Sequence, residues 1–170
     1  KTAVTGWEVE GIHDGGVDAQ IQLTRQRQDS DHAPLQPGTV PAFVSVEREL
    51  VLGIDWQVNT RITRLSQADS AIVLPIPLLP GERITTPGVR VHDDQALLNL
   101  PVDQAEVTWS ASLDKTAHID LQASTTRHFV EIWRLRAAPL WHIESQGIPV
   151  IHHHDATGQW LPEWRPWPGE

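Results

Sequence analysis

The sequence predicts an all-β protein, an antiparallel β-sandwich of the immunoglobulin-like class. Two observations support this prediction. Apolar and polar residues alternate with a period of two along many short segments, as they do in strands with one buried face. Glycines and prolines, 11 and 13 in number, separate these segments at short intervals, as turns do in a sandwich or a barrel.

The longest alternation spans residues 50–58, which we expect to form one strand with its apolar side chains in the core. Residues 129–134 alternate as well, and Phe129, Glu131 and Trp133 would share one face of that strand. Residues 60–68 are the one segment that could form a helical turn.

Shorter alternations predict strands at residues 21–23, 44–46 and 119–121. The chain has eight Trp. Five of them lie on these strands or at repeated positions, and we expect them in the core: Trp7, Trp56, Trp109, Trp133 and Trp141. Residues 26–41 read as a long loop between two strands, which is uncommon in a compact domain.

The composition excludes several classes of protein. The 170 residues carry 13 Lys and Arg against 22 Asp and Glu, and a net charge of −9 disfavours binding to nucleic acid or anionic lipid. Without cysteine the chain has no disulfide and no thiolate metal site. The longest apolar run, residues 71–79, is broken by Pro75 and Pro77, so we expect no direct membrane insertion.

The two halves of the chain share five motifs in the same order. The matched segments are 4–7 with 107–109, 19–23 with 117–121, 43–48 with 129–134, 56–58 with 141–143, and 80–82 with 168–170. This repetition predicts two related β units in tandem, 1–103 and 104–170, the second truncated. The alternative is a single β domain, 1–170. The absence of Met predicts a processed chain or a piece of a longer one.

Two segments carry a resemblance to known proteins. Ile-Pro-Leu-Leu-Pro-Gly-Glu at 76–82 and Trp-Leu-Pro-Glu-Trp-Arg-Pro-Trp-Pro-Gly-Glu at 160–170 resemble stretches of large, uncharacterised, membrane-anchored envelope proteins of proteobacteria. The resemblance covers most of the chain and brings no catalytic motif. It implies an extracytoplasmic, β-rich domain whose parent protein is anchored in a membrane.

The C-terminal segment holds a candidate ligand site. Trp160, Trp164 and Trp167 stand among prolines, where neither a helix nor a central strand is expected. If exposed and coplanar, their rings would form a stacking platform for sugar rings, with Glu163 and Arg165 supplying hydrogen bonds. The alternative is that the rings cap the open end of the sandwich or pack against another domain.

The histidines suggest a second candidate site. If residues 150–154 form a strand, His152 and His154 project from one face at a spacing that suits Zn²⁺ or Cu²⁺. Asp155, His142 or Glu144 would supply a third ligand. The alternative is a solvated strand end that takes up adventitious Zn or Ni. We therefore expect no physiological cofactor.

Signals for catalysis are weak, because the chain has no nucleophile elbow, phosphate loop or zinc-protease motif. Arg61, Arg64, Arg134 and Arg136 read as strand-surface charges paired with acids. The sequence thus predicts a non-catalytic structural or interaction module of a larger bacterial envelope protein. Its partners would be other domains of that protein, other envelope proteins or glycans. A carbohydrate-binding module and a histidine-based metal-binding domain are the alternatives.

Overall fold

The computed structural model describes residues 7–13, 15–25, 41–154, 156, 158 and 160–170. The chain divides into two compact units, Lys1–Thr39 and Val40–Glu170. No helix occurs in the parts of the chain that are described, so the predicted all-β class is confirmed. The predicted long loop lies outside the described residues, apart from Pro41.

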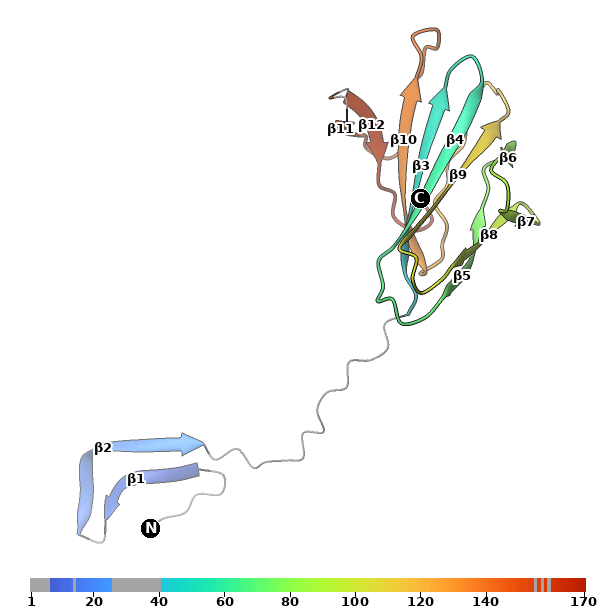
Figure 1. Cartoon of the computed structure of the whole chain (residues 1–170). Coiled ribbons are helices and arrows are strands. Elements are labelled where there is room, and N and C mark those ends of the chain that lie inside the picture. Colours follow the sequence, from blue (N-terminus) through green and yellow to red (C-terminus); the bar gives the residue numbers. More distant parts are fainter. Residues whose placement is uncertain (1–6, 14, 26–40, 155, 157, 159) are drawn as a thin grey trace. The chain divides into compact units, whose positions relative to one another are not determined.

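Strands account for every regular element of the described chain (Figure 1). In chain order they are β1 (Trp7–His13), β2 (Gly16–Arg25), β3 (Val44–Leu52), β4 (Trp56–Arg64), β5 (Ile72–Pro77), β6 (Glu82–Ile84), β7 (Arg90–His92), β8 (Gln95–Leu100), β9 (Glu106–Leu113), β10 (Phe129–Ala137), β11 (Ile151–His154) and β12 (Trp160–Trp164).

The first unit is a hairpin of β1 and β2. The predicted strand at 21–23 lies within β2. Trp7 is exposed here, as are Ile21 and Leu23, so the expectation that Trp7 belongs to a core was wrong. Within this unit, two strands alone cannot enclose these side chains in a core.

The second unit contains two sheets. The large sheet has seven strands in the order β11-β12-β10-β3-β4-β9-β6, and the small sheet has three in the order β5-β8-β7 (Figure 1). Every described strand pair is antiparallel except β10 with β3, which are parallel and aligned from Val44 opposite Phe129 to Leu52 opposite Ala137. Two layers of this kind agree with the predicted β-sandwich.

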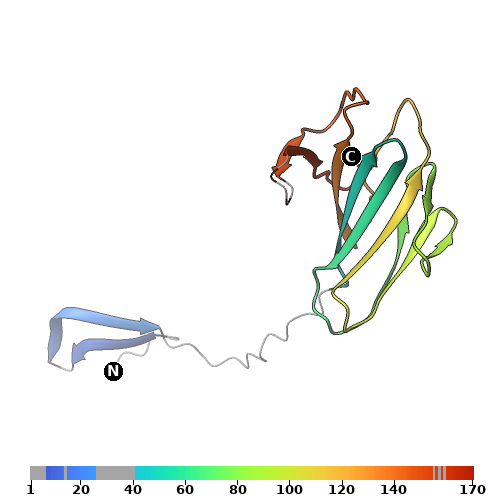
Figure 2. The same cartoon turned by 45° about the horizontal axis from the view of Figure 1, so that its top comes forward.

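The small sheet covers one end of the inner face of the large sheet (Figure 2). Val46, Ile62 and Phe129 of the large sheet pack there with Ile76 and Leu98 of the small sheet. Burying such side chains contributes roughly 1.5–3 kcal/mol each. The predicted apolar face of the strand at 44–46 is thereby confirmed.

Irregular segments cover the other end of the inner face. Leu50 and Val58 pack there with Ile119 and Leu121, which lie between β9 and β10 and form no strand. The strand predicted at 119–121 was therefore wrong. Because β10 runs parallel to β3, the chain must return along the sheet after β9, and these residues cover the core on the way.

A buried polar layer separates the two apolar clusters. Arg48 and Thr60 lie opposite each other on β3 and β4, between the residues of one cluster and those of the other. The Arg48 guanidinium forms an ion pair with Glu131, Nη1 to Oε2 at 3.6 Å, and donates a hydrogen bond to the carbonyl oxygen of Pro77. Both charged side chains are about 5% exposed. Arg48 thus links the large sheet to β5 of the small sheet.

Both carboxylate oxygens of Glu131 accept hydrogen bonds. Its Oε1 accepts a hydrogen bond from the backbone N–H of Ser124 at 2.9 Å, and its Oε2 accepts one from the indole N–H of Trp133 at 3.0 Å. These bonds hold the segment that precedes β10 against the core. The prediction that Phe129, Glu131 and Trp133 share one buried face is confirmed.

Two local predictions were wrong. Residues 50–58 form the end of β3, a turn at 53–55 and the start of β4, because Leu52 pairs with Trp56 and keeps both on the inner face. Ile54, at the turn, is exposed. The helical turn expected at 60–68 is absent from this described segment, since β4 continues to Arg64.

The tandem units and the immunoglobulin-like class are not confirmed. Strands from both sides of residue 103 alternate in the large sheet, where β3 and β4 lie between β10 and β9. Trp56 begins a strand, whereas its proposed counterpart Trp141 lies outside the strands. The two rings pack edge to face instead, with centroids 5.3 Å apart.

We expect Arg48→Ala to lower the free energy of unfolding by about 3–5 kcal/mol, because it leaves the Glu131 carboxylate buried without its charged partner. Urea unfolding followed by tryptophan fluorescence measures this change. Arg83→Ala is the matched control, since the ion pair of Arg83 with Asp114 is exposed and contributes little. Equal unfolding free energies for the two variants would contradict the account.

Glu82 makes stability depend on pH. Burial raises the pKa of Glu82, although the backbone N–H of Leu79 and the charge of Arg48 oppose the shift, and its Oε1 has no hydrogen-bond partner among the described residues. The folded chain then holds this proton to higher pH than the unfolded chain does. Stability should therefore fall as the pH rises from 4.5 through the raised pKa.

We expect Glu82→Gln to remove this decline, so that its unfolding free energy exceeds that of the parent chain at neutral pH more than at pH 4.5. Urea unfolding at a series of pH values checks the difference. The exposed Glu106→Gln should leave the pH dependence unchanged. A decline that persists in the Glu82 variant would show that another group causes it.

Candidate functional site

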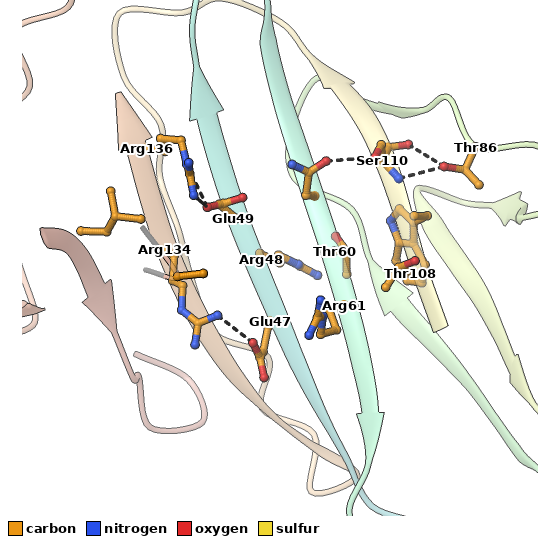
Figure 3. A pocket seen from close by; sticks show the side chains of 14 residues that line it. Glu47, Arg48, Glu49, Thr60, Arg61, Thr86, Thr108, Ser110, Arg134 and Arg136 are labelled. Carbon is orange, nitrogen blue, oxygen red and sulfur yellow. Dashed lines mark hydrogen bonds and ion pairs between the residues drawn. The ribbon is translucent and has the colours of Figure 1, made fainter. Parts of the chain in front are cut away.

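The outer face of the large sheet carries a polar hollow of about 630 Å³, which we call the charged groove. Its floor is formed by β10, β3, β4 and β9, and the polar side chains named next point away from the core because strand residues alternate between faces. The residues that define it here are Glu47, Glu49, Asn59, Ser110, Arg134 and Arg136 (Figure 3).

Arg134 is the centre of an ion-pair network at one side of the charged groove. Its Nη1 lies 2.8 Å from Oε2 of Glu47, and its Nε lies 2.8 Å from Oε2 of Glu163 on β12. The other oxygen of Glu163 accepts a hydrogen bond from Nε of Arg165 at 2.7 Å. The network therefore joins β3, β10 and β12 and fixes the direction of each charged group.

A second pair lies beside the first. Arg136 Nη2 is 2.9 Å from Oε1 of Glu49, so β10 presents a column of guanidinium groups and β3 a column of carboxylates (Figure 3). These four side chains are between 25% and 42% exposed, which leaves each charge accessible to a partner. Exposed pairs contribute little to stability, but they hold charges of known sign in a fixed order.

The other side of the charged groove is neutral. The Ser110 hydroxyl donates to Oδ1 of Asn59 at 2.9 Å, and the Ser110 backbone N–H donates to the hydroxyl oxygen of Thr86 at 2.9 Å. Thr85 and Thr86 follow β6 and donate back to the Ser110 carbonyl oxygen. This segment forms a polar wall along β9.

Glu163 is the most buried charged group beside the groove, with a side chain 1% exposed. Burial by itself raises the pKa of Glu163, but hydrogen bonds from Arg134 and Arg165 outweigh that effect and hold the pKa below its ordinary value. Burial likewise lowers the pKa of Arg134, and the carboxylates of Glu163 and Glu47 reverse that shift. Both groups are therefore charged at neutral pH.

This arrangement suits recognition of a polar surface. Each carboxylate of the network has an arginine partner, whereas acid–base catalysis by two carboxylates needs environments that separate their pKa values. The groove offers donors on β10, acceptors on β3 and neutral hydrogen-bonding groups on β9. A partner with a complementary order of charges could dock across all three strands.

The described residues of the predicted tryptophan platform differ widely in their exposure to solvent. Glu163 is buried in the ion-pair network, and Arg165, its partner, is exposed. Trp164 is half-buried opposite Trp133, and Trp167 is 76% exposed. The ring of Trp160 lies outside the described part of the chain. Whether these residues bind a ligand stays a prediction.

A second, more apolar hollow of about 390 Å³ lies beside β10 and β12. Trp141 and Trp164 line it together with Pro162 and His152. The indole N–H of Trp141 donates to the carbonyl oxygen of Gly53 at 2.8 Å, which fixes this ring. Sequence reasoning placed Trp141 in the core and gave no signal for this hollow.

The predicted metal ligands lie in separate segments of the chain. His152 and His154 lie exposed on β11, as the predicted strand at 150–154 requires, and His142 lies 3.4 Å from Glu144. Asp155 lies outside the described residues. Within the described part of one chain, no group of three or more candidate ligands could hold a metal ion.

The arginines follow the prediction with one exception. Arg61, Arg134 and Arg136 pair with acids, although the pair of Arg61 with Glu106 is long, at 3.6 Å. Arg64 instead donates hydrogen bonds to the carbonyl oxygens of Ser70, Leu100, Pro101 and Gln104. These bonds tie β4 to the end of β8 and to the loops that flank it.

Comparisons of the chain with protein-family models, curated proteins and solved structures found no match. In the part of the chain that the structure describes, no helix has the length and apolar character needed to cross a membrane.

We expect Glu163→Gln to lower the unfolding free energy at neutral pH by about 1.5–3 kcal/mol, because it weakens charged hydrogen bonds with two arginines. The lowered pKa gives Glu163 a stabilising effect above pH 4.5 that is lost as the pH falls through the folded value. The difference between parent and variant should therefore shrink in acid. Urea unfolding at neutral and acidic pH measures it, with the exposed Glu144→Gln as control.

Proposed function

We propose that residues 41–170 form a non-catalytic interaction module of a larger bacterial envelope protein, and that the module binds its partner through the charged groove. The observation that carries this proposal is the fixed order of charges on the outer face, arginines on β10 beside glutamates on β3. Complementary charge order steers association and selects partners. Pre-oriented side chains also lose little freedom on binding.

The partner that fits is another domain of the parent chain or another envelope protein. It would present a polar surface with carboxylates opposite β10 and basic groups opposite β3. The extracytoplasmic location of the module, and the membrane anchor of its parent, rest on the resemblance of residues 76–82 and 160–170 to envelope proteins.

Carbohydrate binding is the second candidate function. The observation that favours it is the exposure of Trp167, whose ring is accessible over most of its surface among prolines. A sugar ring would stack on this indole, and the exposed Arg165 would supply a hydrogen bond.

A photo-activated cross-linking residue at Ser110, inside the charged groove, tests the first proposal in cells of the bacterium that makes the chain. The matched control is the same residue at Asn99, exposed on β8 of the small sheet. We expect one partner, identified by mass spectrometry, from Ser110 and not from Asn99. Arg136→Glu should lower the yield of this cross-linked product by about tenfold or more, because it replaces a guanidinium group of the groove with a carboxylate beside Glu49.

Arg90→Glu, an equal charge change on the exposed β7, should leave that yield unchanged. Equal cross-linking from both positions, or a yield insensitive to Arg136→Glu, would contradict binding through the charged groove.

A further inference from the structure

The charged groove carries two rows of opposite charge on neighbouring strands. Arg134 and Arg136 lie on β10, and Glu47 and Glu49 lie on β3 (Figure 3). The two strands are parallel and adjacent, so the rows are about 4.7–4.9 Å apart. Within each row the charged residues are two positions apart, and they therefore project from the same face of the sheet.

This pattern of charges is complementary to itself. A second copy of the chain can face the first across a two-fold axis that runs along the strands, over the boundary between β10 and β3. Each row of arginines then lies opposite the row of glutamates of the other copy. Such a symmetric interface uses the same surface patch twice, and a patch with charges of one sign would repel its own copy.

We propose that the partner of the charged groove is a second copy of this chain, which binds with its own charged groove. The inference rests on the function proposed above and names the partner for it. Sheets that pack face to face lie about 10 Å apart, with strand directions within about 30° of each other. The long side chain of Arg136 can then meet Glu49 of the second copy, and water bridges the space between the two hollows.

The rest of the outer face accommodates the same two-fold axis. The strand order places β4 and β9 of one copy opposite β12 and β11 of the other. Asn59 on β4 and Ser110 on β9 offer neutral polar groups there. The four charged side chains that face one another are between 25% and 42% exposed, so a second copy can reach each of them.

The net charge of −9 opposes association of two copies at long range. At an ionic strength of about 0.15 M the Debye length is about 8 Å, and charges farther apart than this are largely screened. The facing arginines and glutamates act at shorter distances, so their attraction persists when the repulsion between the net charges is weakened.

The test measures self-association of the full chain by sedimentation equilibrium at about 0.15 M salt. We expect a reversible dimer. Arg136→Glu and Glu49→Arg should each lower the association constant by about tenfold or more, because each places like charges opposite each other. An equimolar mixture of the two variants should associate nearly as well as the parent chain, since the introduced carboxylate then faces the introduced guanidinium. That recovery would also show that both variants fold.

Arg90→Glu and Asp103→Arg are the matched controls, because they make the same charge changes at exposed residues outside the groove. They should leave association unchanged, alone and mixed. Three results would overturn the proposal: a parent chain that stays monomeric, a dimer that both charge reversals in the groove leave intact, or a mixture that associates no better than the single variants.

The cross-linking experiment at Ser110 separates this inference from the proposed function. A product that contains two copies of the chain supports both. A product with a different protein, lowered by Arg136→Glu, would overturn the second copy as the partner and leave the binding role of the groove in place. A product that Arg136→Glu does not affect would contradict both.

Discussion

The buried ion pair between Arg48 and Glu131 joins β3 to β10 in the core of the second unit, and the strands around it must accommodate two buried charges. Arg48 lies on the inner face of β3, where it meets Glu131 of β10 and the carbonyl oxygen of Pro77 at the end of β5. Removing two charges from water is costly, and only a well-formed pair with further hydrogen bonds offsets that cost. The pair lies across the parallel register of β10 and β3, and the further bond from Arg48 to Pro77 reaches the small sheet. We expect the pair to favour this arrangement over others more than it adds to net stability.

This constraint leads to the charged groove. The parallel alignment that brings Glu131 to Arg48 also places Arg134 and Arg136 beside Glu47 and Glu49, on the opposite face. The same register therefore aligns the side chains on both faces: the buried pair on the inner face, and on the outer face the exposed charges that we propose as the binding surface. A shift by one residue would exchange the two faces.

The sequence predicted the strands better than their connections. The alternation in β10 identified its buried face, because Phe129, Glu131 and Trp133 alternate with more exposed residues of the same strand. The same alternation led to a wrong prediction at residues 50–58. A tight turn separates two strands there, and Leu52 and Trp56 on either side of it both point into the core. The alternation of apolar and polar residues cannot distinguish a long strand from two strands joined by a turn when the alternation continues unchanged across that turn.

The site was less accessible to prediction because its pairs are remote in sequence. Arg134 and Glu47 are 87 residues apart, and only the parallel register brings them together. Arg64 shows the same limit, since its partners are carbonyl oxygens whose position depends on the folded loops. The histidines at 152 and 154 were visible because alternation along one strand is a local property.

A double-mutant cycle between Arg48 and Glu131 tests the central claim most directly. The parent chain, Arg48→Met, Glu131→Leu and the double variant would be unfolded in urea, and the four free energies give the coupling between the two side chains. The account predicts a coupling of about 2–3 kcal/mol, with the double variant more stable than either single variant, because neither charge is left buried alone. A coupling near zero would show that the pair does not hold β3, β10 and the small sheet together.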